Sequence, residues 1–423
     1  MQTHAVAFSQ ALEAQGYAVR VLTYRAAASE AEACRASDAQ FRFPVARILS
    51  RLAYWANVKK IAAYAKEHGA QAIYSSTVYF AQAAALAQVP MFCRSAGNDV
   101  LRPWIAWPFR WAAPFLDQPL FEAKLYPWLR RRELPEYFDR YLERTRQRVM
   151  RESACAMGHL AANSEFTAQA LKKIGVAPER IAIEPGGVDP ALFCPGPSCR
   201  TAWGIPPQSF LLLTACRLVA KKGLPLLLEA VAQLAPKLPA LHLAVAGDGP
   251  DRARLAAMAE ALGLKERVHF LGRLPGKELA QAYRAADVFV LPSRSIARGG
   301  QQVDAETMGR VLCEAGACGL PVVAAATGGI PSVVRDGDNG LLFEENQIAE
   351  LVAAILRLAR DPDLRLRLGQ AGRKRAQEEF AWEHLTAAAT MRLEQMLSLE
   401  NSSIIAEQPE PTGNAGVLAA PTS

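Results

Sequence analysis

The sequence predicts an α/β protein with two Rossmann-like domains that face one another across a cleft. Three observations lead to this fold class: short apolar runs alternate with helical stretches, a segment rich in Pro and Gly (CPGPS, 194–198) divides the chain near its middle, and 423 residues suffice for two or three domains. Short apolar strands separated by helices favour parallel sheets that are covered on both faces. Ligands of such sheets bind beyond the carboxyl ends of the strands, so the cleft is the expected site.

The expected elements follow one another in regular alternation. Strands are predicted at ten short apolar runs, namely 18–24, 72–76, 91–96, 159–163, 181–185, 210–216, 241–247, 268–272, 288–292 and 321–326. Helices separate most of them, for instance at 224–235 and 276–286, and an amphipathic helix is expected already at 5–14. We place the domains at 1–195 and 196–380. The polar residues 400–423, with their Pro and Gly, are expected to be a disordered tail.

Composition narrows the class of protein. An apolar fraction of 51% fits a globular chain with a large core, and the eight cysteines form no CxxC pair, which favours a reduced, cytosolic protein. Neither a secretory signal nor an apolar run long enough to span a membrane is present. These features predict a cytoplasmic protein.

The net charge of +7 is concentrated in residues 102–151, which hold eleven Lys and Arg against six Asp and Glu, together with four of the seven tryptophans. Basic residues interleaved with aromatic ones suit an anionic membrane surface. A helical insertion with buried rings and solvated arginines explains the same pattern. Nucleic acid is not expected as a partner, because no recognised binding motif accompanies the charge.

Two cations follow the expected strand at 210–216. Arg217 stands directly after it, and Lys222 comes five residues later, before Gly223 and a helix. Charge-assisted bonds from two cations, together with a helix N-terminus, suit a diphosphate. Further on, the loop from Gly272 to Leu274 offers backbone groups that can pair with a nucleotide base. Taken singly, each of these features also fits an ordinary surface loop.

The segment DAETMGRVLCEAG carries two glutamates, Glu306 and Glu314, with seven residues between them. A helix that begins near Met308 would direct its first backbone N–H groups at a phosphate. These groups belong to Gly309, Arg310, Val311 and Leu312. Glu314, about one and a half turns into the helix, would reach another part of the same ligand. One carboxylate near a sugar and one near a ribose is the division that we expect.

In order and spacing these pieces resemble the retaining glycosyltransferases of family 4, which adopt the GT-B fold of two facing Rossmann-like domains. The resemblance extends from Gln2 to about Leu399, and its most specific part is the E-x7-E block followed by ACGLPVVAAATGGIPSVVRDGDNGLLF. It implies the following roles: Glu306 on the donor sugar, Glu314 on the ribose, Arg217 and Lys222 on the diphosphate with the amides of 309–312, and Leu274, beside Gly272, on the base.

The resemblance also implies the reaction and its partners. A hexose would pass from a nucleotide-diphosphate sugar, the co-substrate, to a glycan or lipid-linked acceptor in lipopolysaccharide, exopolysaccharide or other cell-surface glycan synthesis. The protein would be cytoplasmic, with peripheral contact to the inner face of the membrane through residues 102–151. The helix at 381–399 would cross back to the first domain. No metal or other cofactor is expected, because the D-x-D of residues 336–338 lies in a sequence typical of a turn, RDGDNG.

Two departures from the family concern the acceptor side. Family members often carry a histidine in a His-Gly-x-Asp stretch, whereas CRSAGNDVLR keeps Gly97 and Asp99 but has Ala96 in the histidine's place. The chain also begins with MQTH, in which Gln2 and His4 match residues that follow a strand and a Gly-Gly turn. We therefore expect that Met1 is internal, that roughly 15–20 residues are missing, and that the N-terminal sheet has a central gap.

Other functions fit less well. A catalytically impaired homologue that binds nucleotide or a partner without turnover is the main alternative, favoured by Ala96 and by the late start. A dinucleotide oxidoreductase lacks its GxGxxG fingerprint. A sugar-nucleotide epimerase shares the fold, but the E-x7-E block favours transfer.

Overall fold

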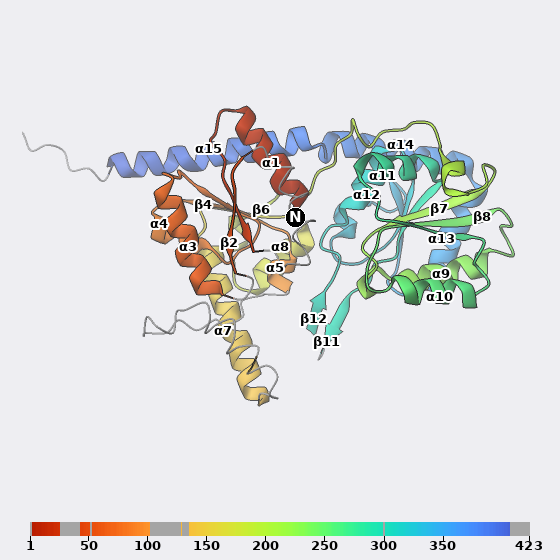
Figure 1. Ribbon diagram of the computed structural model, residues 1–423, viewed down its shortest axis with the longest axis horizontal. Coiled ribbons are helices and arrows are strands. Elements are labelled where there is room, and N and C mark those ends of the chain that lie inside the picture. Colours follow the sequence, from red (N-terminus) through yellow and green to blue (C-terminus); the bar gives the residue numbers. More distant parts are fainter. Residues whose placement is uncertain are drawn as a thin grey trace, which may run out of the picture.

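The computed structural model describes residues 2–25, 43–50, 53–101, 128, 135–298 and 301–406. It has two lobes, which lie on either side of the 194–198 segment in the chain (Figure 1). Each lobe contains a parallel sheet with helices packed on its faces. The predicted α/β architecture with two Rossmann-like domains is therefore confirmed.

The N-terminal lobe contains a four-stranded parallel sheet in the order β3-β4-β5-β6. Its strands are β3 (Ile73–Ser75), β4 (Met91–Ser95), β5 (His159–Ala162) and β6 (Ile181–Ile183). Two further strands, β1 (Val21–Tyr24) and β2 (Val45–Leu49), form a separate parallel pair. Within the described residues no strand joins this pair to the larger sheet, and the expected missing strand stays a prediction.

Helices cover the N-terminal sheets. They are α1 (Gln2–Ala14), α3 (Tyr54–Glu67), α4 (Ala81–Ala87), α5 (Asn98–Leu101), α7 (Glu136–Cys155) and α8 (Glu165–Lys173). The helix α7 projects beyond the rest of the lobe (Figure 1). Residues 102–127 and 129–134 of the basic, aromatic segment lie outside the described residues. No helix in the described ranges has both the length and the apolar character needed to cross a bilayer.

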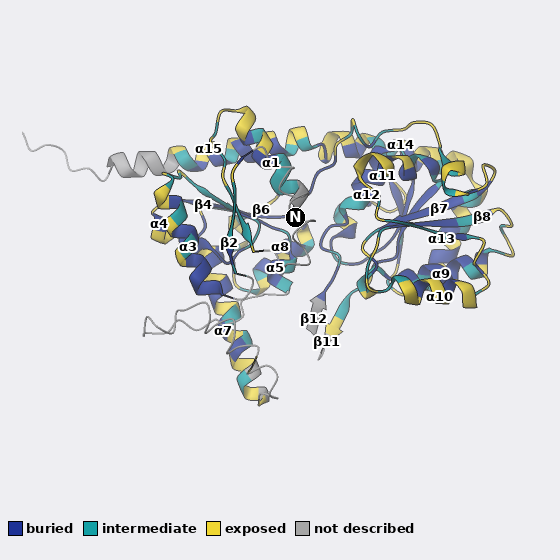
Figure 2. Cartoon of the chain, in the orientation of Figure 1, coloured by how far each residue is buried: buried dark blue, intermediate teal, exposed yellow. Residues whose placement is uncertain are grey.

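The C-terminal lobe contains a six-stranded parallel sheet in the order β14-β13-β10-β7-β8-β9. Its strands are β7 (Phe210–Ala215), β8 (Leu241–Ala246), β9 (Val268–Gly272), β10 (Val288–Leu291), β13 (Val322–Ala325) and β14 (Gly340–Phe343). Leu211 and Leu213 belong to one hydrophobic core and Leu212 to the other, since successive side chains point to opposite faces. Figure 2 shows these strands buried between helices whose outer faces are exposed.

The helices of this lobe are α9 (Leu224–Leu234), α10 (Arg252–Ala261), α11 (Gly276–Ala285), α12 (Arg310–Ala317), α13 (Ile348–Arg360) and α14 (Pro362–Glu379). An antiparallel hairpin of β11 (Ile296–Arg298) and β12 (Gln301–Asp304) extends from the lobe (Figure 1). Short 3-10 turns occur at η3 (Pro178–Arg180), η4 (Arg200–Trp203), η5 (Ala220–Lys222) and η6 (Ile330–Ser332).

The last helix, α15 (Trp382–Ala406), returns to the N-terminal lobe and lies beside α1 (Figure 1). Its apolar side chains complete a core cluster with Phe8 of α1 and Phe92 of β4; they are Ala389, Leu393 and Met396. Arg392 adds an ion pair of 2.6 Å to Glu184, which follows β6. The helix thereby ties the two ends of the chain together.

Several details differ from the sequence-based expectations. The tail assigned to 400–423 is wrong for residues 400–406, which continue α15, and the remainder of the tail lies outside the described residues. Neither β2 nor the β11–β12 hairpin was expected, because both are short and Arg47 or Arg298 interrupts their apolar pattern. The turn at 336–338 is confirmed: Gly337 has a φ of +73° and Asp336 caps it by accepting from the Leu342 N–H at 2.8 Å.

Candidate active site

Lys222 and Glu306 meet at the carboxyl edge of the C-terminal sheet. Lys222 is the last residue of the turn η5, which follows β7 in the chain. Its Nζ donates to Oε2 of Glu306, and the same oxygen accepts from the Ser293 hydroxyl at 3.4 Å. The side chains are only 12% and 13% exposed. Burial opposes ionisation of Glu306, but the Lys222 ammonium outweighs it and holds the pKa of Glu306 below its usual value. Two residues predicted for catalysis are thus in direct contact.

A glycine allows this arrangement. Gly223 has a φ of +63°, and a Cβ there would lie 1.8 Å from the carbonyl oxygen of Pro292. The turn that carries Lys222 therefore packs directly against the chain that leaves β10. Any side chain at position 223 would push the ammonium away from Glu306.

A second ion pair lies next to the first and was missed by sequence reasoning. Lys221 Nζ contacts Asp304 Oδ1 at 3.1 Å and the Ala305 carbonyl at 3.2 Å. The only signal in the sequence was the lysine doublet itself. Together the two pairs fasten the turn after β7 to the segment 304–306.

Arg217 is not part of this cluster. Its side chain is exposed on the turn after β7, and within the described part of the chain it forms no hydrogen bond or ion pair. The expected clamp of Arg217 and Lys222 is not assembled in this structure, because Glu306 holds the Lys222 ammonium. Diphosphate binding by the two cations stays a prediction.

The helix α12 begins at Arg310, and its N-cap residue, Gly309, has a φ of +85°. Of the four amides predicted to face a phosphate, the Leu312 N–H is engaged, since it donates to the Gly309 carbonyl at 2.9 Å. The N–H groups of Gly309, Arg310 and Val311 have no acceptor among the described residues. Three donors at a helix start form a site suited to an anion.

Glu314, within α12, is buried. Tyr283 of α11 donates its hydroxyl to Glu314 Oε2 at 3.0 Å, and Arg310 Nη2 lies 3.5 Å from Oε1. Burial raises the pKa of Glu314. The structure thus places this carboxylate between Tyr283 of α11 and Arg310 of α12. Its contact with a ribose stays a prediction, and its partner Tyr283 was not anticipated.

The loop after β9 has the features expected for pairing with a base. Gly272 has a φ of +69°, and its carbonyl accepts from the Gly247 N–H at 2.6 Å, which joins the loops after β8 and β9. The Leu274 side chain packs on the lobe's core, while its N–H and carbonyl form no hydrogen bond with any described residue. These two backbone groups are free to meet a ligand.

Asp99, predicted for the acceptor side, has a structural role. It is buried and accepts from the Ser95 hydroxyl at 2.7 Å and from the Val78 N–H at 3.0 Å. Burial raises the pKa of Asp99 in spite of these bonds. The carboxylate therefore fixes the loop between β4 and α5, and the structure does not direct it toward a ligand.

His4 lies at the start of α1, where its Nδ1 is 3.0 Å from the Tyr74 hydroxyl and its ring meets the edge of Trp382 from α15. Burial, aided by the charge of Arg94, lowers the pKa of His4 to about 2. Its imidazole is neutral at physiological pH and packs where the two ends of the chain meet.

Gly97 has a φ of +86° and reaches the boundary between the lobes. A Cβ there would lie 2.5 Å from the hydroxyl of Thr167 and 2.7 Å from the Thr307 methyl group. Thr307 follows Glu306 directly, so the loop at Ala96–Gly97, predicted for the acceptor, touches the loop at residues 304–309, predicted for the donor; we call them the acceptor loop and the donor loop. Within the described residues, no group of three or more His, Cys, Asp or Glu comes together as a metal site.

Family models match both halves of the chain: "Glycosyltransferase Family 4" over residues 1–192 and "Glycosyl transferases group 1" over residues 198–375. A D-inositol 3-phosphate glycosyltransferase of Stackebrandtia nassauensis is 35% identical over 66% of this chain. A GDP-mannose-dependent alpha-(1-6)-phosphatidylinositol monomannoside mannosyltransferase of Mycolicibacterium smegmatis is 35% identical over 51% of it. The matched regions cover 62% and 55% of those relatives.

Solved structures show the same fold. HepE from Anabaena, in complex with UDP, superposes with a TM-score of 0.71 at 21% identity, over 93% of this chain and 96% of the other. WaaG, a glycosyltransferase involved in lipopolysaccharide biosynthesis, gives 0.62 at 20% identity over 92% and 95%. Both are similar to this chain over both lobes.

Proposed function

Because the chain belongs to the glycosyltransferases of family 4 and has their two-lobed GT-B fold, we propose that it transfers a hexose from a nucleotide-diphosphate sugar to a hydroxyl group with retention of configuration. The main support is the contact between Lys222 and Glu306 beside three free amides at the start of α12. A buried ammonium and a helix start are suited to a diphosphate, and a carboxylate next to them to sugar hydroxyls.

In this proposal the donor diphosphate occupies the start of α12, where it accepts from the amides of Gly309, Arg310 and Val311. The Lys222 ammonium, paired with Glu306 three residues before Gly309, stabilises the charge that grows on the diphosphate as the sugar leaves. Arg217, exposed on the same turn, swings in to the second phosphate. Leu274 offers its two free backbone groups to the base.

The proton balance needs no protein base. The acceptor oxygen attacks the anomeric carbon on the face from which the phosphate departs, the bond from that carbon to the phosphate oxygen breaks, and the departing oxygen takes the acceptor proton. Ala96 in place of the family's histidine favours this route. Arg217→Ala and Lys222→Met should therefore reduce turnover far more than replacement of any histidine.

We propose a glycan or lipid-linked acceptor, made for a lipopolysaccharide, an exopolysaccharide or another surface glycan. The named relatives act on an inositol phosphate and a phosphatidylinositol monomannoside, and WaaG serves lipopolysaccharide synthesis. Tyr137 on the projecting helix α7 is 72% exposed and Arg148 63%, which suits peripheral contact with anionic lipid. Sedimentation with phosphatidylglycerol vesicles, compared with phosphatidylcholine vesicles, tests this contact.

The alternative is a chain that binds nucleotide without turnover. One experiment separates the two: the protein is titrated with UDP and GDP by calorimetry and incubated with radiolabelled UDP-glucose or GDP-mannose and total lipid extract. Labelled lipid or glycan product supports transfer, and its loss in Lys222→Met assigns the product to this site. Nucleotide binding without any product across donors would replace the proposed transfer by the alternative.

A further inference from the structure

Four side chains form a hydrogen-bonded cluster where the two lobes meet, and we call it the boundary cluster: Asn163, Ser164, Thr167 and Thr307. Three of them belong to the N-terminal lobe, at the end of β5 and the start of α8, whereas Thr307 belongs to the donor loop of the other lobe. All four are less than 9% exposed. The contact is therefore shielded from water, and it consists of hydrogen bonds between uncharged groups.

The central bond of the cluster crosses the boundary. The Ser164 hydroxyl donates to the Thr307 carbonyl at 2.5 Å, and Asn163 Nδ2 donates to the Thr307 hydroxyl at 3.3 Å. The backbone just before Thr307 is held as well, since the Glu306 carbonyl accepts from the Gly329 N–H at 2.8 Å within its own lobe. The donor loop is thus hydrogen-bonded to both lobes.

Asn163 links the same contact to the acceptor loop. Its Nδ2 also donates to the Ala96 carbonyl at 3.1 Å, and its backbone N–H donates to the Ser95 carbonyl at 3.1 Å. The Thr167 hydroxyl donates to Asn163 Oδ1 at 2.6 Å, which fixes the orientation of the amide. One side chain therefore bonds the loop beside Gly97 and the loop beside Glu306.

We propose that Ser164 and Asn163 are positioning residues that set Glu306 and the Ala96–Gly97 loop in register when the lobes close. This inference rests on the proposed function, because Glu306 and the acceptor loop matter only if the site transfers a sugar. Neither residue touches Lys222 or the free amides of α12. Loss of the boundary bond should therefore leave nucleotide binding intact and lower the rate of the chemical step.

A glycine substitution separates this role from helix capping. Ser164 is also the N-cap of α8, where it accepts from the Thr167 N–H at 3.2 Å. Glycine is tolerated at an N-cap with little loss of stability, whereas it removes the hydroxyl that reaches Thr307. The matched control is Ser209→Gly: Ser209 is also buried and also donates to a carbonyl, that of Pro206, but this bond lies entirely within the C-terminal lobe.

The experiment measures kcat, donor KM, UDP and GDP affinity, and the radius of gyration by small-angle scattering. For Ser164→Gly we expect kcat to fall about 10–100-fold, since a misplacement of about 1 Å costs up to that much, with donor KM and nucleotide affinity within about twofold. The radius of gyration should rise above that of the wild type and of Ser209→Gly, because the lobes lose their bond.

The outcomes are distinct. Unchanged kcat and radius of gyration in Ser164→Gly would overturn the inference, as would a loss confined to donor KM. If no donor gives product with the wild type, the proposed function fails, while the scattering comparison still decides whether the boundary cluster holds the lobes together. An increase in radius of gyration that Ser209→Gly shares would assign the effect to general loosening and also overturn it.

Discussion

Replacing Lys222 with methionine should cost both stability and activity, and the two losses can be separated. Methionine keeps the apolar stem but removes the ammonium, so the Glu306 carboxylate, 13% exposed, keeps the Ser293 hydroxyl as its hydrogen-bond donor and the charge of the neighbouring Lys221. Loss of one partner from a buried ion pair costs about 3–5 kcal/mol. Partial exposure of both groups puts our expectation near the lower end, about 3 kcal/mol. Glu306→Gln leaves the ammonium unpaired and should cost a similar amount.

The double variant provides the test. Lys222→Met with Glu306→Gln leaves no unpaired charge at these two positions, so we expect its free energy of unfolding to lie about 1–2 kcal/mol below the wild type, whereas additive losses would give about 6 kcal/mol. The assay is urea unfolding of the wild type, the two single variants and the double variant, whose free energies of unfolding are compared when their dependence on urea concentration is the same. Turnover should stay lost in the double variant, because both groups that meet the donor are gone. Additive losses of stability would refute the coupling, and recovered turnover would refute the catalytic assignment.

The pair should also make stability depend on pH. Since the folded-state pKa of Glu306 lies below its usual 4.5, its contribution is complete above that value and is lost as the pH falls through the folded pKa. Lys222→Met should lack this acid-dependent loss. The free energy of unfolding of wild type and variant, measured across that range, should therefore converge toward low pH.

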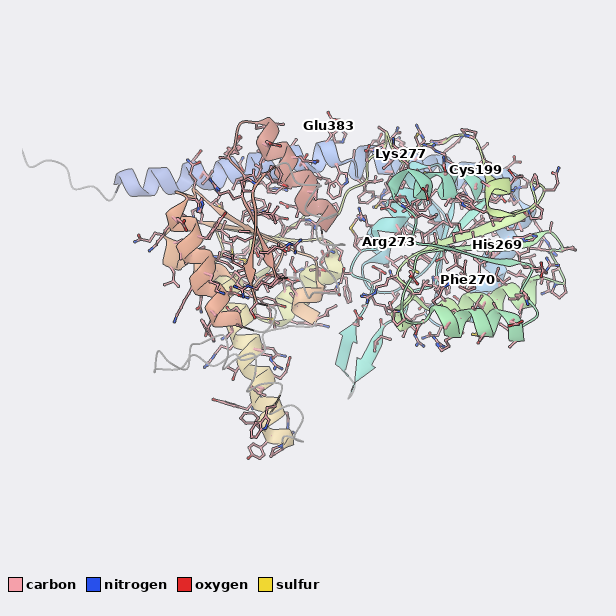
Figure 3. The ribbon with its side chains drawn as sticks, in the orientation of Figure 1. Cys199, His269, Phe270, Arg273, Lys277 and Glu383 are labelled. Carbon is pink, nitrogen blue, oxygen red and sulfur yellow. The ribbon has the colours of Figure 1, made fainter. Side chains whose placement is uncertain are left out.

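Three further predictions concern other parts of the chain. Gly97→Ala should cost about 1–3 kcal/mol and reduce turnover, because a φ of +86° strains alanine and the new methyl meets two threonines at the lobe boundary; wild-type thermal stability would contradict this. His242 Nδ1 on β8 lies 3.0 Å from His269 Nε2 on β9 (Figure 3 shows His269 in the C-terminal lobe), and burial lowers the pKa of each histidine below 6.5. The melting temperature should therefore fall when the pH is lowered from about 7.5 to about 5.5, and it should fall less in a variant with glutamine at both positions. Tyr283→Phe should destabilise by about 1–3 kcal/mol by leaving the buried Glu314 carboxylate short of a donor, and adding Glu314→Gln should reduce that loss in urea unfolding.

Much of the fold could be predicted because its strands have simple patterns. The runs at 210–216 and 241–247 are apolar at nearly every position, since both faces of the C-terminal sheet are covered, and they became β7 and β8. The strand β2 escaped prediction because it is short and half-buried along most of its length, and Arg47 interrupts its pattern.

The sequence predicted which residues belong to the candidate site, but it did not predict which of them contact one another. The spacing of Glu306 and Glu314 identified both glutamates, yet it could not show that one binds Lys222 while the other is enclosed by Tyr283. Asp99 likewise matched an acceptor motif, but its carboxylate accepts from the Ser95 hydroxyl and so stabilises the turn between β4 and α5. Ser164 carried only the signal of a helix cap, and its bond to Thr307 depends on how the lobes meet.

The return of α15 to the N-terminal lobe has a consequence for how the chain is made. Phe8 and Phe92 leave the ribosome early, but the helix that covers them is translated last. At 5–20 residues per second, the roughly 290 residues between Phe92 and Trp382 take about 15–60 s to synthesise. During that interval the nascent lobe presents an uncovered apolar surface, a binding site for chaperones. Rare codons upstream of α15, or an early stop codon before it, should therefore lower the yield of folded protein far more than similar changes after it.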